Sequence, residues 1–307
     1  MGNVCCLGEC MMELVEHPGG TLVRGFGGDT LNTALYLARL GVPTDYVTAL
    51  GTDVFSDEMV RAWGDEGVGT GHILRLPGRL PGLYLIQTDE LGERRFFYWR
   101  DAAPVRQLFA LPETPQIQAA LTAAELIYLS GITLSLFDEE SRNRLFETLD
   151  IARRRGGLVA FDTNFRLRGW PDLHAARAVY DRMFLRSDIV LASVEDYFLL
   201  QGTASSEELI TRLAAAEVRE AVVKLATPAC HVIIGKDAQV VEAEPVEAVV
   251  DTTAAGDSFA AGYIAARRAG MRPERAARIG HTLAGAVVRH RGAIIPRSAM
   301  PEIVFQP

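Results

Sequence analysis

The sequence predicts an α/β fold: a doubly wound, mainly parallel sheet flanked by helices, with a small β-sheet lid. Three observations support this prediction. Short apolar runs alternate with amphipathic helical segments along most of the chain. The apolar runs are continuous, as expected of strands that are covered on both faces. Two regions, 9–26 and 80–100, break the alternation and contain pieces typical of antiparallel strands.

The expected elements of the main body follow from these patterns. Strands of the main sheet are expected at residues 3–8, 45–50, 126–130, 158–162, 189–192, 221–225 and 231–235. Helices are expected at 30–40, 56–66, 139–155, 173–186, 206–216, 256–269 and 273–289. The chain contains no internal repeat and no linker rich in Pro, Gly and Ser, which favours a single domain over 1–307.

The second of the two irregular regions has the pattern of a β-hairpin. Residues 83–89 and 94–100 are strand-like runs on either side of a Gly-containing turn at 90–93. A hairpin that projects from an α/β sheet can form a flap over a substrate. Its exposed edge can also pair with another subunit by strand addition, so we expect a homo-oligomer formed through the lid.

Composition excludes several classes of function. With 31 basic and 39 acidic residues, the net charge of −8 disfavours a protein that binds nucleic acid. No window approaches the ~20 apolar residues of a membrane span. The four cysteines lack zinc-ligand spacing, and no export signal is visible, so a cytoplasmic protein with free thiols is expected. Neither lysine, Lys224 or Lys236, lies in a Walker-type loop, so any ATP site must use another device.

One segment, 250–259, predicts a phosphate site. Ala254, Ala255 and Gly256 are small enough for the backbone to approach a ligand, and an Ala-rich helix follows. The N–H groups of a first helical turn lack partners inside the helix and form an anion-binding site. Asp257 lies in that turn, where its carboxylate can accept a proton from an attacking hydroxyl. The alternative is an ordinary helix start, because Asp and small residues are common there.

A second glycine-rich segment, 25–34, precedes another helix. Gly28 allows close approach of the backbone, and Asp29 and Asn32 in the first turn are suitable partners for sugar hydroxyls. The alternative is an N-terminal helix cap after a glycine turn.

Together these two segments resemble the two signatures of the ribokinase-like (PfkB) carbohydrate kinases. Further segments are similar to bacterial 2-keto-3-deoxygluconate kinases and run along the chain in that group's order: 8–11, 27–33, 47–53, 79–84, 92–94, 97–100, 162–166 and 292–297. The resemblance implies a ribokinase-like fold and transfer of phosphate from ATP, with Mg²⁺, to the 6-hydroxyl of the sugar acid. A kinase of a neutral sugar, fructose or ribose, and a sugar-sensing module without turnover remain alternatives.

The resemblance also implies roles for individual residues. Asp257 would be the general base, and residues 254–256 would form the anion hole. The sugar would be bound by Gly28, Asp29, Asn32, Tyr84, Tyr98, Arg100 and Arg166. Nucleotide positions would be Asn164, Ser193, Lys224, Ala226, Thr227, Gly256 and His281, with Asp162 near the transferred phosphoryl group. Arginine suits a carboxylate substrate because its planar fork matches a planar oxyanion.

The sequence departs from the family pattern at two places. The family's N-x-x-E magnesium element aligns with residues 193–196, where Ser193 replaces Asn and Asp196 replaces Glu. Asp196 is therefore expected to contact the metal only indirectly. Ala226 stands where the family has glycine, and Thr227 and Pro228 follow it. The added methyl group and the stiff proline are expected to alter nucleotide affinity.

Overall fold

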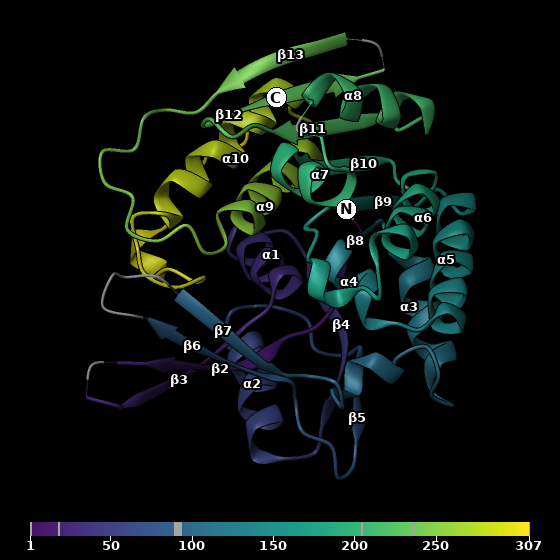
Figure 1. Cartoon of the computed structure of the whole chain (residues 1–307), viewed down its shortest axis with the longest axis vertical. Helices are drawn as coiled ribbons and strands as arrows, with labels where there is room; N and C mark the ends of the chain where they lie inside the picture. The colour runs from purple at the N-terminus through teal and green to yellow at the C-terminus, as the bar shows by residue number, and fades with distance from the viewer. Residues whose placement is uncertain (1, 18, 89–93, 204, 236, 307) are drawn as a thin grey trace.

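The computed structural model describes residues 2–17, 19–88, 94–203, 205–235 and 237–306, and within them it contains two β-sheets (Figure 1). The large sheet has nine strands, which in spatial order are β13 (Asp237–Glu242), β12 (Ala229–Ile234), β11 (Glu220–Lys224), β10 (Ile189–Ser193), β9 (Leu158–Asp162), β8 (Leu126–Ser130), β1 (Val4–Leu7), β4 (Thr44–Gly51) and β5 (Ile73–Leu76). From β11 to β5 neighbouring strands are parallel, whereas β12 and β13 are antiparallel additions at one edge. The predicted doubly wound, mainly parallel sheet is confirmed.

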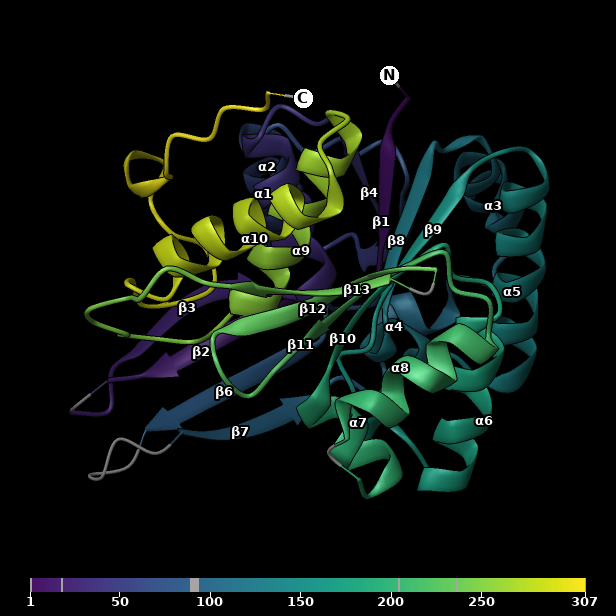
Figure 2. The same cartoon turned by 90° about the horizontal axis from the view of Figure 1, so that it is seen from above.

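Helices cover both faces of this sheet (Figure 2). One face carries α1 (Asp29–Arg39), α2 (Val54–Asp65), α9 (Ala255–Arg268) and α10 (Pro273–Val287). The other carries α3 (Thr114–Ala123), α4 (Gly131–Leu136), α5 (Glu139–Arg154), α6 (Leu173–Phe184), α7 (Val194–Gln201) and α8 (Ser206–Ala215). Short 3₁₀ turns are η1 (Pro104–Gln107), η2 (Leu167–Gly169) and η3 (Arg297–Ala299). Because both faces are buried, alternate residues of β1 enter opposite cores, Val4 and Cys6 on one side and Cys5 and Leu7 on the other.

The strand order reverses at β1, and this reversal determines where a ligand can bind. The chain passes from β1 to β4 and β5 on one side, then returns to β8 on the other side and continues to β11. In open α/β sheets, ligands bind beyond the carboxyl ends of the strands at such a switch point. The segments that follow β1, β8, β9 and β10 therefore lead into the candidate site.

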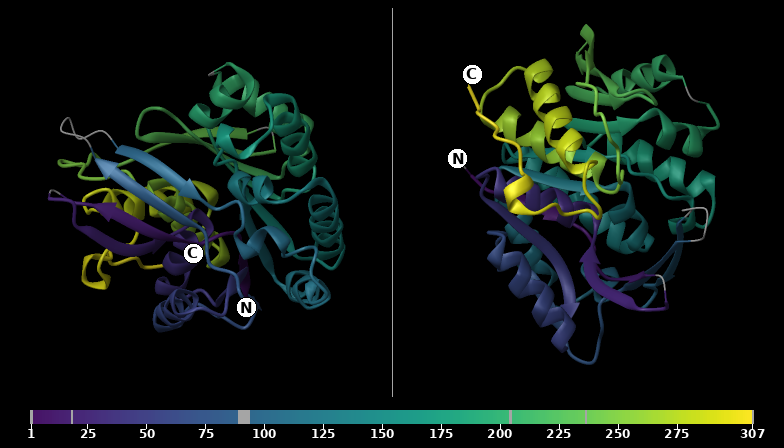
Figure 3. Two further views of the ribbon diagram at one scale, coloured as in Figure 1. Left: turned by 60° about the horizontal axis from the view of Figure 1, so that its bottom comes forward. Right: turned by 90° about the vertical axis from the view of Figure 1, so that its left-hand side faces the viewer.

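The small sheet projects from one side of the α/β body (Figure 3). Its strand order is β3 (Leu22–Gly27), β2 (Met11–Glu16), β6 (Leu83–Thr88) and β7 (Arg94–Trp99). The outer pairs are antiparallel, as predicted, but β2 and β6 in the centre run parallel. The predicted lid regions 9–26 and 80–100 thus form one sheet. The predicted turn at 90–93 lies outside the described residues.

Five further elements were not predicted from the sequence: β5, β13, α3, α4 and α7. The strands β5 and β13 lie at the two edges of the large sheet and bury little, so they lack the continuous apolar run of a central strand. The helices α4 and α7 have six and eight residues, too few for a clear helical period. All four cysteines are free and buried, and no helix among the described residues has the length and hydropathy of a membrane span.

Helices α9 and α10 pack closely because glycines face each other across their interface. A Cβ atom on Gly262 would lie 3.0 Å from the Cα atom of Gly280. A Cβ atom on Gly280 would lie 2.9 Å from the ring and the carbonyl oxygen of Phe259. Neither position has room for a side chain, so the two glycines determine how close α9 lies to α10, and with it the position of the N-terminus of α9.

We therefore predict that Gly280→Ala destabilises the protein by ~1–3 kcal/mol, because the added methyl group forces the two helices apart. Gly285, also on α10, is the matched control. Its Cβ atom would lie 3.4 Å from the Val246 side chain, so Gly285→Ala is expected to be neutral or to stabilise by up to ~1 kcal/mol through helix propensity. Urea unfolding curves of both variants measure the difference. Equal free energies of unfolding would contradict the packing argument.

Candidate active site

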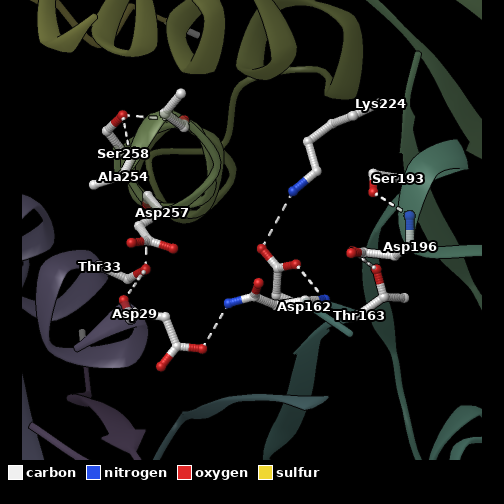
Figure 4. A network of polar contacts seen from close by, with 12 residues as sticks. Asp29, Thr33, Asp162, Thr163, Ser193, Asp196, Lys224, Ala254, Asp257 and Ser258 are labelled. Carbon is white, nitrogen blue, oxygen red and sulfur yellow. Dashed lines mark hydrogen bonds and ion pairs between the residues drawn. The ribbon is translucent and has the colours of Figure 1, made fainter. Parts of the chain in front are cut away.

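Polar side chains from four elements meet at the switch point (Figure 4). Asp29 and Asn32 belong to the first turn of α1, and Asp257 to the first turn of α9. Asp162 is the last residue of β9, and Lys224 the last residue of β11. The structure thus brings together residues that lie more than 200 positions apart in the sequence, as in the hydrogen bond from Asn32 to Asp257, which spans 225 positions.

Glycine is required where α1 begins. Gly28 is the N-terminal cap residue of α1 and has no side chain to supply a cap hydrogen bond. A Cβ atom at this position would lie 2.1 Å from the carbonyl oxygen of Glu9. The start of α1 therefore contacts the chain that leaves β1, and this contact sets the position of Asp29.

Specific hydrogen bonds hold the carboxylates. The Asn32 Nδ2 atom donates to Asp257 Oδ2 over 2.8 Å, and Asn164 Nδ2 donates to Asp29 Oδ2 over 2.8 Å. The backbone N–H of Asn164 donates to Asp162 Oδ1 over 3.2 Å. Asn164 adopts a φ of 25°, a conformation uncommon outside glycine, which places its amide between the two aspartates.

This concentration of negative charge changes the proton affinity of the site. Burial, followed by the negative charge of Asp29 and that of Asp162, raises the pKa of Asp257 from 3.8 to about 8. Burial also raises the pKa of Asp162, although the Lys224 ammonium, 3.3 Å from its Oδ2 atom, opposes the rise. Burial lowers the pKa of Lys224, but attraction to Asp162, Asp196 and Asp257 outweighs it and leaves that pKa raised. Lys224 therefore stays charged beside the aspartates.

The N-terminus of α9 has the backbone geometry of an anion site. Ala254 caps the helix in the left-handed conformation, with φ of 59° and ψ of 16°. The N–H of Ala255 donates to the carbonyl of Thr252, whereas those of Gly256 and Asp257 have no hydrogen-bond acceptor within the described part of the chain. Two N–H groups and the positive end of the helix dipole thus face the space beside the Asp257 carboxylate.

A cavity of about 770 Å³ adjoins this polar cluster on the lid side. Its lining includes five of the predicted sugar-binding residues: Gly28, Asp29, Tyr98, Arg100 and Arg166. It also includes residues that the sequence did not indicate: Glu9, Met11, Arg106, Ile132, Ser135 and Arg168. Four arginines against three acidic residues, Glu9, Asp29 and Asp101, give the lining a net positive charge, which suits an anionic ligand. The sequence does contain a signal for Glu9. This residue follows the carboxyl end of a buried strand, as Asn164 does, and ligands bind at such strand ends.

Tyr84 lies outside this lining. Its hydroxyl donates to the Glu13 carboxylate on β2, and its ring lies 6.1 Å from the ring of Tyr98, with 34° between the two planes. In this structure Tyr84 therefore supports Tyr98 from the neighbouring strand, and its contact with sugar stays a prediction.

The predicted nucleotide residues lie outside the lining of this cavity. Ala226 and Thr227 are exposed in the turn between β11 and β12. His281, on α10, is half-buried; its ring lies 4.9 Å from that of Phe259, and its Nε2 atom lies 3.4 Å from the sulfur of Cys230. Burial lowers the pKa of His281, so its imidazole is neutral near pH 7. The Ser193 hydroxyl accepts a hydrogen bond from the Asp196 N–H and caps α7.

The acidic residues fit a magnesium ion that is bound chiefly by phosphate and water. Asp196 accepts a hydrogen bond from Thr163 Oγ1 over 2.8 Å, and its other oxygen lies 3.5 Å from Arg166 Nη1. Within the described residues, no three His, Cys, Asp or Glu side chains form a group that could hold a metal by themselves. Mg²⁺ commonly keeps several waters and takes its remaining ligands from substrate phosphates. The indirect contact through Asp196 stays a prediction.

Comparisons with known proteins identify the family and the fold. The family described as pfkB family carbohydrate kinase matches residues 1–300. The 2-dehydro-3-deoxygluconokinase of Dickeya dadantii is 45% identical over 306 residues, which cover 97% of this chain and 98% of that protein. The structure of a fructokinase with bound ATP from Xylella fastidiosa is similar with a TM-score of 0.84 and 25% identity, over 97% of this chain and 95% of that one. A putative ribokinase II from E. coli, in complex with ATP and Mg²⁺, shares the fold with a TM-score of 0.83 and 24% identity, over 95% and 94% of the two chains.

The raised pKa of Asp257 leads to a prediction about stability. A carboxyl whose pKa is higher in the folded than in the unfolded state contributes stability below its unfolded pKa, and this contribution is lost as the pH rises through the folded pKa. Asparagine does not ionise, so the Asp257→Asn variant does not lose stability in this way as the pH rises. We therefore expect the variant to melt above the wild type by at least ~3 °C at alkaline pH, and the difference to grow between pH 3.8 and about 8.

Melting temperatures measured across this pH range test the prediction. Asp65→Asn, which removes an exposed carboxylate at the end of α2, controls for the change in net charge. A difference between Asp257→Asn and the wild type that does not vary with pH would show that Asp257 does not titrate as the cluster requires.

Proposed function

This chain belongs to the pfkB family of carbohydrate kinases, and from that premise we propose that it phosphorylates 2-keto-3-deoxy-D-gluconate. ATP is the proposed phosphate donor, the 6-hydroxyl of the sugar acid is the acceptor, and 2-keto-3-deoxy-6-phosphogluconate is the product. The substrate, also called 2-dehydro-3-deoxygluconate, is the one named for the relative that is 45% identical.

The observation that carries the proposal is the position of Asp257. Its carboxylate lies in the first turn of α9, beside the free N–H groups of that turn, and Asn32 fixes one of its oxygens. A hydroxyl group next to this carboxylate can lose its proton to Asp257 while its oxygen bonds to the γ-phosphorus of ATP. The bond from that phosphorus to the β,γ-bridging oxygen breaks, and ADP leaves.

The groups around Asp257 supply the positive charge that this transfer needs. The two N–H groups face the developing charge on the phosphoryl oxygens. The Lys224 ammonium lies near them, 3.4 Å from the position that a Cβ atom on Gly256 would take and 3.3 Å from Asp162 Oδ2. Asp162 and, through water, Asp196 would hold Mg²⁺, which would neutralise phosphate charge when it is bound with ATP. Binding of Mg²⁺ would also lower the raised pKa of Asp257 and favour the basic form of this residue.

A neutral sugar such as fructose or ribose is the second candidate substrate. The similarity to a fructokinase structure favours it, because the fold and the Asp257 region do not discriminate between these substrates. The arginines of the cavity favour the sugar acid instead. Two of them, Arg100 and Arg166, are positions where the family resemblance implies contact with the substrate carboxylate.

We propose further that the lid pairs with a second copy of the chain. The strands β3 and β7 form the two edges of the small sheet, and both expose apolar side chains: Leu22 and Val23 on β3, and Phe96, Phe97, Tyr98 and Trp99 on β7. Exposed apolar edge strands favour pairing with another strand.

The substrate is tested by measuring ADP release with ATP and Mg²⁺ against 2-keto-3-deoxygluconate, gluconate, fructose and ribose in parallel. We expect turnover of the keto-deoxy acid and little with the others. Asp257→Asn should lower kcat by about 10²- to 10⁴-fold and leave the affinity for the sugar nearly unchanged. Full turnover in this variant would exclude Asp257 as the base. Preferred turnover of fructose or ribose by the wild type would show that the substrate is a neutral sugar.

Light scattering coupled to size-exclusion chromatography tests the pairing of the lid. The expected mass is a multiple of the 33.5 kDa chain, and Val23→Lys on β3 should shift it toward the monomer. The same charge change at Leu185, an exposed apolar residue at the end of α6, is the control: Leu185→Lys should leave the mass unchanged. A monomeric wild type, or an assembly insensitive to Val23→Lys, would contradict pairing through β3.

A further inference from the structure

Glu9 places a buried negative charge in the wall of the cavity. It follows β1 at the switch point and is only 4% exposed. Its carboxylate forms an ion pair with the guanidinium of Arg100, which follows β7. A buried carboxylate needs such a partner, because an isolated charge in a dry environment is costly. The charge of Arg100 is thus already balanced before any substrate binds.

Arg100 nevertheless keeps hydrogen-bonding capacity. Its Nε atom is buried and has no hydrogen-bond acceptor within the described residues. The side chain can therefore donate to an oxygen of a bound sugar while Glu9 compensates its charge. Arg100 supplies oriented hydrogen bonds to the cavity, but the Glu9–Arg100 pair contributes no net charge.

Arg106 is brought to the same wall by the turn that follows β7. The Ala103 N–H donates to the carbonyl of Arg100, and the Arg106 N–H donates to the carbonyl of Ala103, each over 3.1 Å. The Arg106 side chain is half-buried and lines the cavity. It makes no ion pair and no hydrogen bond through its guanidinium with any described residue. Burial raises the pKa of Glu9, and the charges of Arg100 and then of Arg106 oppose that rise, which shows that Arg106 acts on the same small region.

The other two arginines of the cavity are in different surroundings. The side chain of Arg166 is 60% exposed and already contacts Asp196, and Arg168 is exposed on the following turn. Water and salt screen an exposed charge, so each contributes less to binding than a partly dry one. Among the arginines that line the cavity, Arg106 is the one that is partly dry and forms no ion pair with a described residue.

We propose that Arg106 is a specificity-determining residue that supplies the net positive charge for the carboxylate of the substrate. This inference rests on the proposed function, in that it assumes a sugar acid in the cavity. Arg100, neutralised by Glu9, orients the ligand through hydrogen bonds, and Arg106 provides the electrostatic attraction. A neutral sugar gains nothing from Arg106, so the residue selects substrates by charge.

The test compares Arg106→Gln with Arg61→Gln, which removes the same charge from the exposed surface of α2. For 2-keto-3-deoxygluconate we expect Arg106→Gln to raise KM by about 10- to 100-fold, the effect of losing a charge-assisted hydrogen bond, with kcat within about threefold of the wild type. Arg106→Lys should recover part of the loss, because it restores the charge without the planar fork. Arg61→Gln should match the wild type, and equal melting temperatures would show that the variants are folded.

A role confined to stabilising Glu9 gives a different result. If Arg106 acts only through Glu9, then Arg106→Gln has no further effect on KM once Glu9→Gln has removed that charge, and this outcome overturns the inference. A direct role predicts a similar rise in KM in both backgrounds.

The proposal and the proposed function can fail separately. If the wild type phosphorylates 2-keto-3-deoxygluconate and Arg106→Gln leaves KM unchanged, the inference is overturned and the function stands. If the wild type phosphorylates only neutral sugars, the proposed function is overturned, and the inference with it.

Discussion

The confinement of several aspartates around one lysine is the interaction on which the rest of the site depends. Asp29, Asp162 and Asp257 share a partly dry space, and Lys224 is the cation that the sheet provides there. Such a cluster opposes folding, because burial and the charges of Asp29 and Asp162 disfavour ionisation of Asp257. It persists because the parallel sheet fixes Asp162 and Lys224 at strand ends, while packed helices fix Asp29 and Asp257. The mutual repulsion that reduces stability also prepares a base that binds a proton readily.

Backbone strain is concentrated at the same place. Two of the three described non-glycine residues with positive φ, Asn164 and Ala254, belong to the cluster, and the third is Glu217. A left-handed conformation costs about 1–2 kcal/mol for a residue with a Cβ atom. At Ala254 the conformation turns the chain so that the first N–H groups of α9 point into the site. At Asn164 it directs the amide between two carboxylates. In both cases the strained residue orients groups that the proposed transfer uses.

Charge is distributed differently in the two halves of the site. Around Asp257 the side chains are mainly acidic, and a cation such as Mg²⁺, bound together with ATP, would balance their charge. In the cavity beneath the lid arginines predominate, and one of them, Arg100, is neutralised by Glu9. A ligand with a hydroxyl at one end and a carboxylate at the other complements both halves. The lid forms part of the cavity wall, since Tyr98 lies on β7, Arg100 directly follows it and both line the cavity.

The sequence by itself determined the class of fold, most of the central strands and the residues around Asp257, because these depend on local signals: continuous apolar runs, glycine-rich helix starts and family motifs. It did not determine the edge strands β5 and β13 or the parallel pairing of β2 with β6, which depend on partners distant in the sequence. Only the tertiary structure showed that Glu9 neutralises Arg100 and that Arg106 forms no ion pair with a described residue. The net charge of a cavity depends on which side chains are buried together, and local sequence patterns do not predict which distant side chains these are.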